Sequence, residues 1–92
     1  MHTIKKWLLL QMKNNMILID VRTKGEYEGG HIEGAVNHDI MDMMAGVFPS
    51  IGKDEEVTIY CESGNRSMMA KSMMEQAGFT KVTDAGSIDN LK

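Results

Sequence analysis

Two short apolar runs, each ending at a polar residue, constrain the fold of this sequence most strongly. The first is 16–19, which ends at Asp20, and the second is 57–60, which ends at Cys61. Runs this short and this apolar are typical of strands that are buried on both faces of a sheet. The stretches between them have helical character. We therefore predict an α/β fold with a small, mostly parallel sheet of about four to five strands and helices on both faces.

Local signals predict the remaining strands and one short helix. Weaker strands are expected at 35–37 and 81–83. Thr23 followed by Glu26 fits a capping box, in which each side chain accepts a hydrogen bond from a free backbone amide at the start of a helix. The pair Gly29-Gly30 is expected to end that helix.

A longer helix is predicted after Cys61. It begins at Arg66 or Ser67 and continues to Ala77, where Gly78 supplies a stop. The chain has ten methionines, and we interpret them as flexible core filler, with Met69 and Met73 on one packed side of this helix. Three further methionines fit either the rim of a site or ordinary packing: Met41, Met43 and Met44.

The length of 92 residues predicts a single domain over 1–92, with an N-terminal helix and link at 1–15 and a core at 16–92. Residues 3–12 are predicted to form an amphipathic helix capped by Thr3, with Trp7 and Leu8 on its apolar face. The apolar run near the N-terminus is shorter than the roughly 7 to 15 residues of a secretory signal. The sequence as written is therefore expected to be cytoplasmic, and a periplasmic location fits if a leader has been removed.

The charge argues against two classes of partner. The formal net charge is -3 and the sequence pI is about 5.5, so phosphate backbones and anionic lipids exert no general attraction. No stretch approaches the roughly 18 apolar residues of a membrane span. We expect neither a nucleic-acid partner nor a membrane.

Cysteine and histidine usage argues against metals. The chain has one cysteine, which excludes an internal disulfide and the usual cysteine clusters of zinc sites. His2, His31 and His38 do not fall at the spacing of a helical metal site. We therefore expect no metal and no cofactor.

The loop after Cys61 carries the strongest functional signal. A cysteine at the end of a strand and just before a helix lies at the edge where parallel sheets bind ligands. Gly64 permits a positive φ, so successive N–H groups can converge on an anion. The N-terminus of the next helix and Arg66 add positive field, which favours thiolate over thiol. The predicted site consists of the nucleophile Cys61 and the loop residues Glu62, Ser63, Gly64, Asn65 and Arg66.

A thiolate in such a cradle is suited to covalent sulfur transfer. It attacks the outer sulfur of an anionic donor such as thiosulfate, and a Cys61 persulfide remains. Transfer to cyanide, a small thiol or a protein thiol then regenerates the thiolate. Both half-reactions proceed without a metal or an organic cofactor.

The sequence resembles the rhodanese family, particularly its small single-domain sulfurtransferases, over nearly all of 17–91. Two signatures carry the resemblance: IDVR, EY and GHIEGAVN at 19–22, 26–27 and 30–37, and IYCESGNRS at 59–67. The resemblance implies that Cys61 carries the persulfide, that 62–66 form the amide cradle and that Arg66 binds the donor's oxyanion. It also implies a mainly structural role for the first signature. Accordingly, Asp20, Arg22, Glu26 and His31 are expected to form structural hydrogen bonds and ion pairs.

Two features depart from the family pattern. The tail has Gly86-Ser87 where paired glycines are common, and it ends near Leu91 where many members continue with a tryptophan. Glu62 places a carboxylate beside the nucleophile, which offsets part of the field of Arg66 and favours a change of donor preference.

Two alternative functions remain open from the sequence. One is a non-enzymatic module that uses this fold for protein contacts or thiol sensing. The other is a cysteine phosphatase or arsenate reductase. It is disfavoured because phosphatases place one residue more between cysteine and arginine than lies between Cys61 and Arg66.

Overall fold

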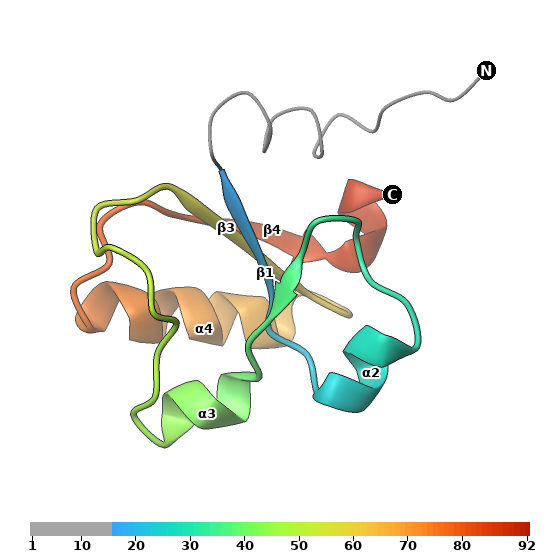
Figure 1. Cartoon of the computed structure of the whole chain (residues 1–92), viewed down its shortest axis with the longest axis horizontal. Helices are drawn as coiled ribbons and strands as arrows, with labels where there is room; N and C mark the ends of the chain where they lie inside the picture. Colours follow the sequence, from blue (N-terminus) through green and yellow to red (C-terminus); the bar gives the residue numbers. More distant parts are fainter. Residues whose placement is uncertain (1–15) are drawn as a thin grey trace.

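The computed structural model describes residues 16–92, and four strands in this part of the chain form one sheet (Figure 1). They are β1 (Ile17–Asp20), β2 (Val36–Asn37), β3 (Val57–Cys61) and β4 (Val82–Ser87). Their order across the sheet is β2-β1-β3-β4, and every neighbouring pair is parallel. The predicted α/β class and parallel sheet are confirmed. The helix predicted over 3–12 lies outside the described residues.

The two central strands are the apolar runs that stand out in the sequence. β1 and β3 pair from Ile17 opposite Val57 to Asp20 opposite Tyr60. All five residues of β3 are buried. Because parallel strands end at the same edge, the polar end of β1 and Cys61 at the end of β3 lie together at the carboxyl edge of the sheet.

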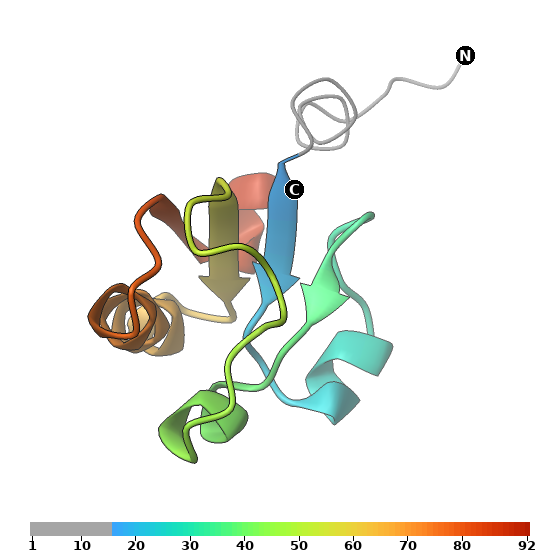
Figure 2. The same cartoon turned by 60° about the vertical axis from the view of Figure 1, so that its left-hand side comes forward.

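Helices cover both faces of this sheet, as predicted (Figures 1 and 2). On one face, α3 (Ile40–Met44) and α4 (Asn65–Gln76) bury Met43, Ala70 and Met74 against β1 and β3. On the other, the 3-10 helix η1 (Ile88–Leu91) buries its two apolar ends beside Tyr60. The sheet is therefore the middle layer, and its two faces belong to two separate apolar clusters.

The short helix α2 (Lys24–Glu28) has the predicted capping box. The Thr23 hydroxyl accepts a hydrogen bond from the Glu26 amide, and the Glu26 carboxylate accepts one from the Thr23 amide. Gly29 is the C-cap. This helix leaves the carboxyl end of β1, so it brings Glu26 to the same edge of the sheet as Cys61.

Three predicted details are wrong. α4 begins at Asn65, earlier than expected, because Gly64 has φ +102° and the chain turns directly into the helix. β4 continues to Ser87 because a register shift opposite the Ile59–Tyr60 step keeps its last residues paired with β3. Met69 is 46% exposed, since Ser67, Ala70 and Met74 form the buried face of α4 instead.

Candidate active site

Cys61 is the last residue of β3 and belongs to the apolar cluster beneath α4. Its exposed fraction is 0%, and Ala70 and Met74 are in the same cluster. Burial was not expected, because the residues that follow Cys61 in the sequence are polar. Strand alternation explains it: Cys61 shares the α4 side of the sheet with Ile59, whereas Tyr60 faces the other cluster.

Backbone N–H groups nevertheless converge on the buried sulfur. The Gly64 amide lies 2.9 Å from Cys61 Sγ and the Ser67 amide lies 3.3 Å from it. The Ser67 hydroxyl is 3.5 Å from the same atom and also donates to the Gly64 carbonyl at 3.1 Å. Since Gly64 adopts the left-handed region, the chain can fold back over the sulfur within three residues.

The electrostatic surroundings of Cys61 favour the thiolate. Burial is the largest single influence, and it raises the pKa of the Cys61 thiol. The side-chain hydrogen bond with Ser67 and the hydrogen bonds from three backbone amides oppose it, and the net pKa is lower than that of an ordinary cysteine; the amides are those of Ser67, Gly64 and Ser63. The N-terminus of the 12-residue helix α4 also favours the thiolate, because helix N-termini stabilise negative charge.

The structure places the predicted site residues in three different roles. Ser63 and Gly64 supply N–H groups to the sulfur, as the cradle hypothesis expected. Asn65 is the first residue of α4, and no hydrogen bond joins it to the sulfur. Glu62 and Arg66 turn their side chains to partners outside the loop.

Ser67 is the residue that the sequence reasoning missed. Its side chain is fully buried and its amide and hydroxyl both face Sγ. The sequence signal that could have identified it is a hydroxyl residue in the first turn of the helix that follows the loop. The backbone amides of that turn have no hydrogen-bond partner within the helix and can face the sulfur.

Arg66 is bound by Glu26 of α2. The two side chains form a two-point ion pair, with Nη1···Oε1 at 2.7 Å and Nη2···Oε2 at 2.8 Å. The Arg66 guanidinium lowers the pKa of Glu26 to about 2. Hydrogen bonding to Glu26 raises the pKa of Arg66, and the charge of Cys61 raises it further. Arg66 therefore contributes to the field at the sulfur while its donors are occupied by a carboxylate.

Arg22 ties the loop to the core of the sheet. Its guanidinium bonds the buried Asp20 carboxylate, the Gly30 carbonyl at 2.7 Å and Glu62 Oε1 at 3.0 Å. The Tyr60 hydroxyl donates to the same Asp20 carboxylate at 2.8 Å. Asp20 and Arg22 thus have the structural role predicted for them, and they also fix the side chain that follows the nucleophile.

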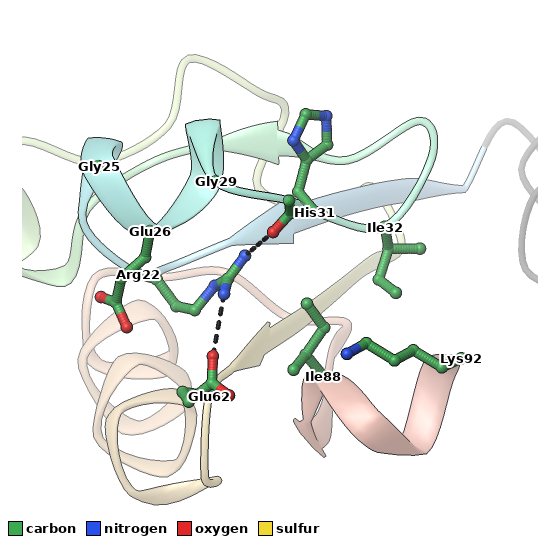
Figure 3. Close-up of a pocket in the computed structure, with 10 residues that line it drawn as sticks. Arg22, Gly25, Glu26, Gly29, His31, Ile32, Glu62, Ile88 and Lys92 are labelled. Atoms are coloured by element: carbon green, nitrogen blue, oxygen red, sulfur yellow. Dashed lines mark hydrogen bonds and ion pairs between the residues drawn. The ribbon is translucent and has the colours of Figure 1, made fainter.

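A groove of about 610 Å³ borders the loop between α2 and η1 (Figure 3). Arg22 and Glu62 meet on one side of it, and Ile32 and Ile88 lie across from them. His31 is at its rim, stacked on Tyr27 with ring centroids 3.7 Å apart and bonded through Nδ1 to the Tyr27 carbonyl. Cys61 itself does not line the groove, which reaches the loop at Glu62.

Neither metal-ion clusters nor membrane helices occur in the described part of the chain. Over 16–92, no three histidine, cysteine or acidic side chains are grouped closely enough to hold an ion. None of the helices in that range has the length and apolar character to cross a bilayer.

Comparison with known proteins points to one family. Residues 4–88 match the family model described as the rhodanese-like domain. The chain is 30% identical over 74 residues to the thiosulfate sulfurtransferase PspE of Escherichia coli, covering 79% of this chain and 71% of that protein. It spans less than two thirds of the next four curated relatives, from 19% to 64% of their lengths.

Solved structures agree with this match. A structure titled rhodanese with anions from E. coli has a TM-score of 0.70 and 31% identity, with 82% of this chain and 89% of that chain covered. The human single-domain sulfurtransferase TSTD1 has a TM-score of 0.78 over 92% of this chain and 88% of its own. At 21% identity, the human protein supports the fold alone.

Proposed function

This chain belongs to the family of rhodanese-like domains and is a sulfurtransferase, and we propose that Cys61 carries the transferred sulfur as a persulfide. The proposed donor is a small anion with a terminal sulfur, such as thiosulfate. The proposed acceptor is cyanide or a thiol. The observation that carries the proposal is the convergence of the Gly64 and Ser67 amides on Cys61 Sγ, at 2.9 and 3.3 Å.

In the first half-reaction, the Cys61 thiolate attacks the outer sulfur of thiosulfate. A new S–S bond forms at Sγ, the S–S bond of the donor breaks, and sulfite leaves with the electron pair. The product is a Cys61 persulfide anion, so the total charge is conserved. Because Cys61 is fully buried, the donor reaches it only after a local rearrangement of the residues around the sulfur.

In the second half-reaction, the acceptor attacks the outer sulfur of the persulfide. Cyanide yields thiocyanate and a thiolate yields a new persulfide, and in both cases Cys61 thiolate is the leaving group. The same amides that lower the pKa of Cys61 stabilise this leaving group. Low thiol pKa therefore supports both the attack and the departure of Sγ.

The ion pair of Arg66 argues against the phosphatase alternative. A phosphatase needs its arginine to bind the oxygens of the phosphoryl group, whereas both outer nitrogens of Arg66 are bonded to Glu26. The short loop between Cys61 and Arg66 adds to this argument. The non-enzymatic alternative makes a different prediction, because a pure interaction module gains no sulfur from a donor.

The test is incubation of the purified protein with thiosulfate, followed by intact-mass measurement. We expect one added sulfur atom on the wild type and none on Cys61→Ser. Ser72→Ala, on the exposed side of α4, is the matched control and should load normally. Absence of the adduct on folded wild type with every donor tried would favour the interaction module. Release of phosphate from an aryl phosphate, with no sulfur gain, would favour the phosphatase.

A further inference from the structure

Within residues 16–92, two cations and two carboxylates line the groove beside the Cys61 loop, and when their salt-bridge partners are counted with them there is one carboxylate more than there are cations. In and around it, within the described residues, three cations each have a carboxylate partner, and a fourth carboxylate is left over. The pairs are Arg22 with Asp20, Arg66 with Glu26 and Lys92 with Asp89, and the fourth carboxylate is Glu62. Glu62 also pairs with Arg22, but Asp20 already neutralises that guanidinium by accepting hydrogen bonds from its Nε and Nη2.

Glu62 is held beside the nucleophile at two points, one on its side chain and one on its backbone. Its Oε1 accepts a hydrogen bond from Arg22 at 3.0 Å, and its backbone carbonyl accepts one from the Ser87 hydroxyl at 2.7 Å. The side chain remains 55% exposed, and it lines the groove. A molecule that enters the groove toward the loop therefore meets a fixed negative charge on the residue next to Cys61 (Figure 3).

The opposite side of the groove carries two apolar side chains, together with Lys92, whose ammonium group is paired with Asp89 at 3.4 Å. Figure 3 shows Ile32 and Ile88 facing the Arg22–Glu62 pair across it. A short carbon chain can pack against these side chains while a cationic group lies near Glu62. This combination is complementary to a small aminothiol and unfavourable for a thiol that carries a carboxylate.

We propose that the acceptor thiol binds in this groove and that Glu62 selects positively charged acceptors over negatively charged ones. The proposal rests on the persulfide function of Cys61. The acceptor thiolate attacks the outer sulfur, the S–S bond to Sγ breaks, and the acceptor leaves as a persulfide while Cys61 returns to thiolate. The amide cradle thus favours an anionic donor, and the groove favours a cationic acceptor.

The test separates the two half-reactions. The protein is loaded with sulfur from thiosulfate and freed of excess donor. It is then mixed with an acceptor thiol at about pH 8, where an ordinary histidine is neutral. Three acceptors of similar size are compared: cysteamine, mercaptoethanol and mercaptopropionate. Loss of the added sulfur is followed by intact mass for wild type, Glu62→Gln and Glu28→Gln. Glu28 is the matched control, because it is an exposed acid on α2 that does not line the groove.

The measured quantity is the variant-to-wild-type rate ratio for each acceptor, in which the intrinsic reactivity of each thiol cancels. For Glu62→Gln we expect the cysteamine ratio to fall about threefold to tenfold relative to the mercaptopropionate ratio, with mercaptoethanol between them. Glu28→Gln should leave the three ratios equal. Added salt should reduce the preference of the wild type, since exposed charges are screened.

Three results would overturn the proposal. Equal ratios for all three acceptors in Glu62→Gln, with normal loading, would reject the selectivity and leave the persulfide function intact. If that variant does not load, the salt dependence of the wild type decides: a ratio of the cysteamine rate to the mercaptopropionate rate that does not fall on adding salt rejects the selectivity. Failure of wild type itself to load would reject both proposals.

Discussion

Arg66 on α4 and Glu26 on α2 hold each other through two short hydrogen bonds, across 40 positions of the sequence. The pair connects the first turn of the helix that covers Cys61 with the capping box of α2. It also neutralises a guanidinium whose pKa responds to the charge on Cys61. Glu26 therefore limits how much positive field reaches the sulfur.

We predict that Glu26→Gln improves the binding of an anionic donor. Glutamine can still serve in the capping box, but the charge of Arg66 is no longer cancelled. The KM for thiosulfate should fall about threefold to tenfold in steady-state assays. Glu28→Gln removes the same charge from the same helix without touching Arg66, so its KM should match that of the wild type. Equal effects of the two substitutions would contradict the role of the pair.

Lowering the pH should reduce the free energy of unfolding, because it protonates the Glu26 carboxylate. The pKa of Glu26 is lowered from 4.5 to about 2, so its contribution is complete above pH 4.5 and is lost as the pH falls from 4.5 toward 2. Because both side chains are one-third exposed, the contribution is about 0.5–1 kcal/mol. Urea unfolding of wild type and Glu26→Gln at several pH values checks this: the difference between them should shrink on acidification. A constant difference would exclude this titration.

Gly64→Ala should impair both folding stability and sulfur loading. An added Cβ would meet the Gly86 backbone only at ordinary contact distance, 3.8 Å, so the cost comes from the left-handed backbone, about 1–2 kcal/mol. Relief of that strain would turn the Gly64 amide away from Sγ. Gly46→Ala is the control, since Gly46 has φ +87° and nothing within 4 Å. It should lose similar stability in urea unfolding but load sulfur at the wild-type rate.

Ser67→Ala should raise the pKa of the Cys61 thiol, because the side-chain hydrogen bond between Cys61 and Ser67, which lowers that pKa, is removed. The pH profile of iodoacetamide alkylation reports this directly. At neutral pH the alkylation rate should fall about threefold to tenfold, as for a weak hydrogen bond to a charged group. Ser72→Ala on the same helix should not change the profile. An unchanged profile in Ser67→Ala would mean that the backbone amides alone set the thiol pKa.

Local patterns in the sequence were enough to predict much of the fold. The apolar runs ending at Asp20 and Cys61 predicted the two central strands, because a strand buried on both faces needs apolar side chains in succession. The Thr23–Glu26 capping box predicted α2 because both partners lie within one turn. The loop after Cys61 predicted converging amides because Gly64 permits the required turn.

The remaining features depend on long-range packing. α4 carries methionines on several sides, so its sequence did not show that Met69 is exposed and Met74 buried. β4 extends through residues with little strand preference because its pairing with β3 outweighs local propensity. The partners of Glu62 and Arg66 come from β1 and α2, and only the assembled sheet edge brings them together.

Cys61 belongs to the same apolar cluster as Ile59 and Met74, so residues around the sulfur tolerate substitution less well than exposed residues at the edge of the site. Changes that repack the neighbourhood of the sulfur disturb the architecture and the reactivity at once. Glu62, at the solvent-facing border, can vary without opening a void. Substitutions at exposed residues such as Glu62 can therefore change the substrate preference of such a domain at less cost to its fold than substitutions around the nucleophile.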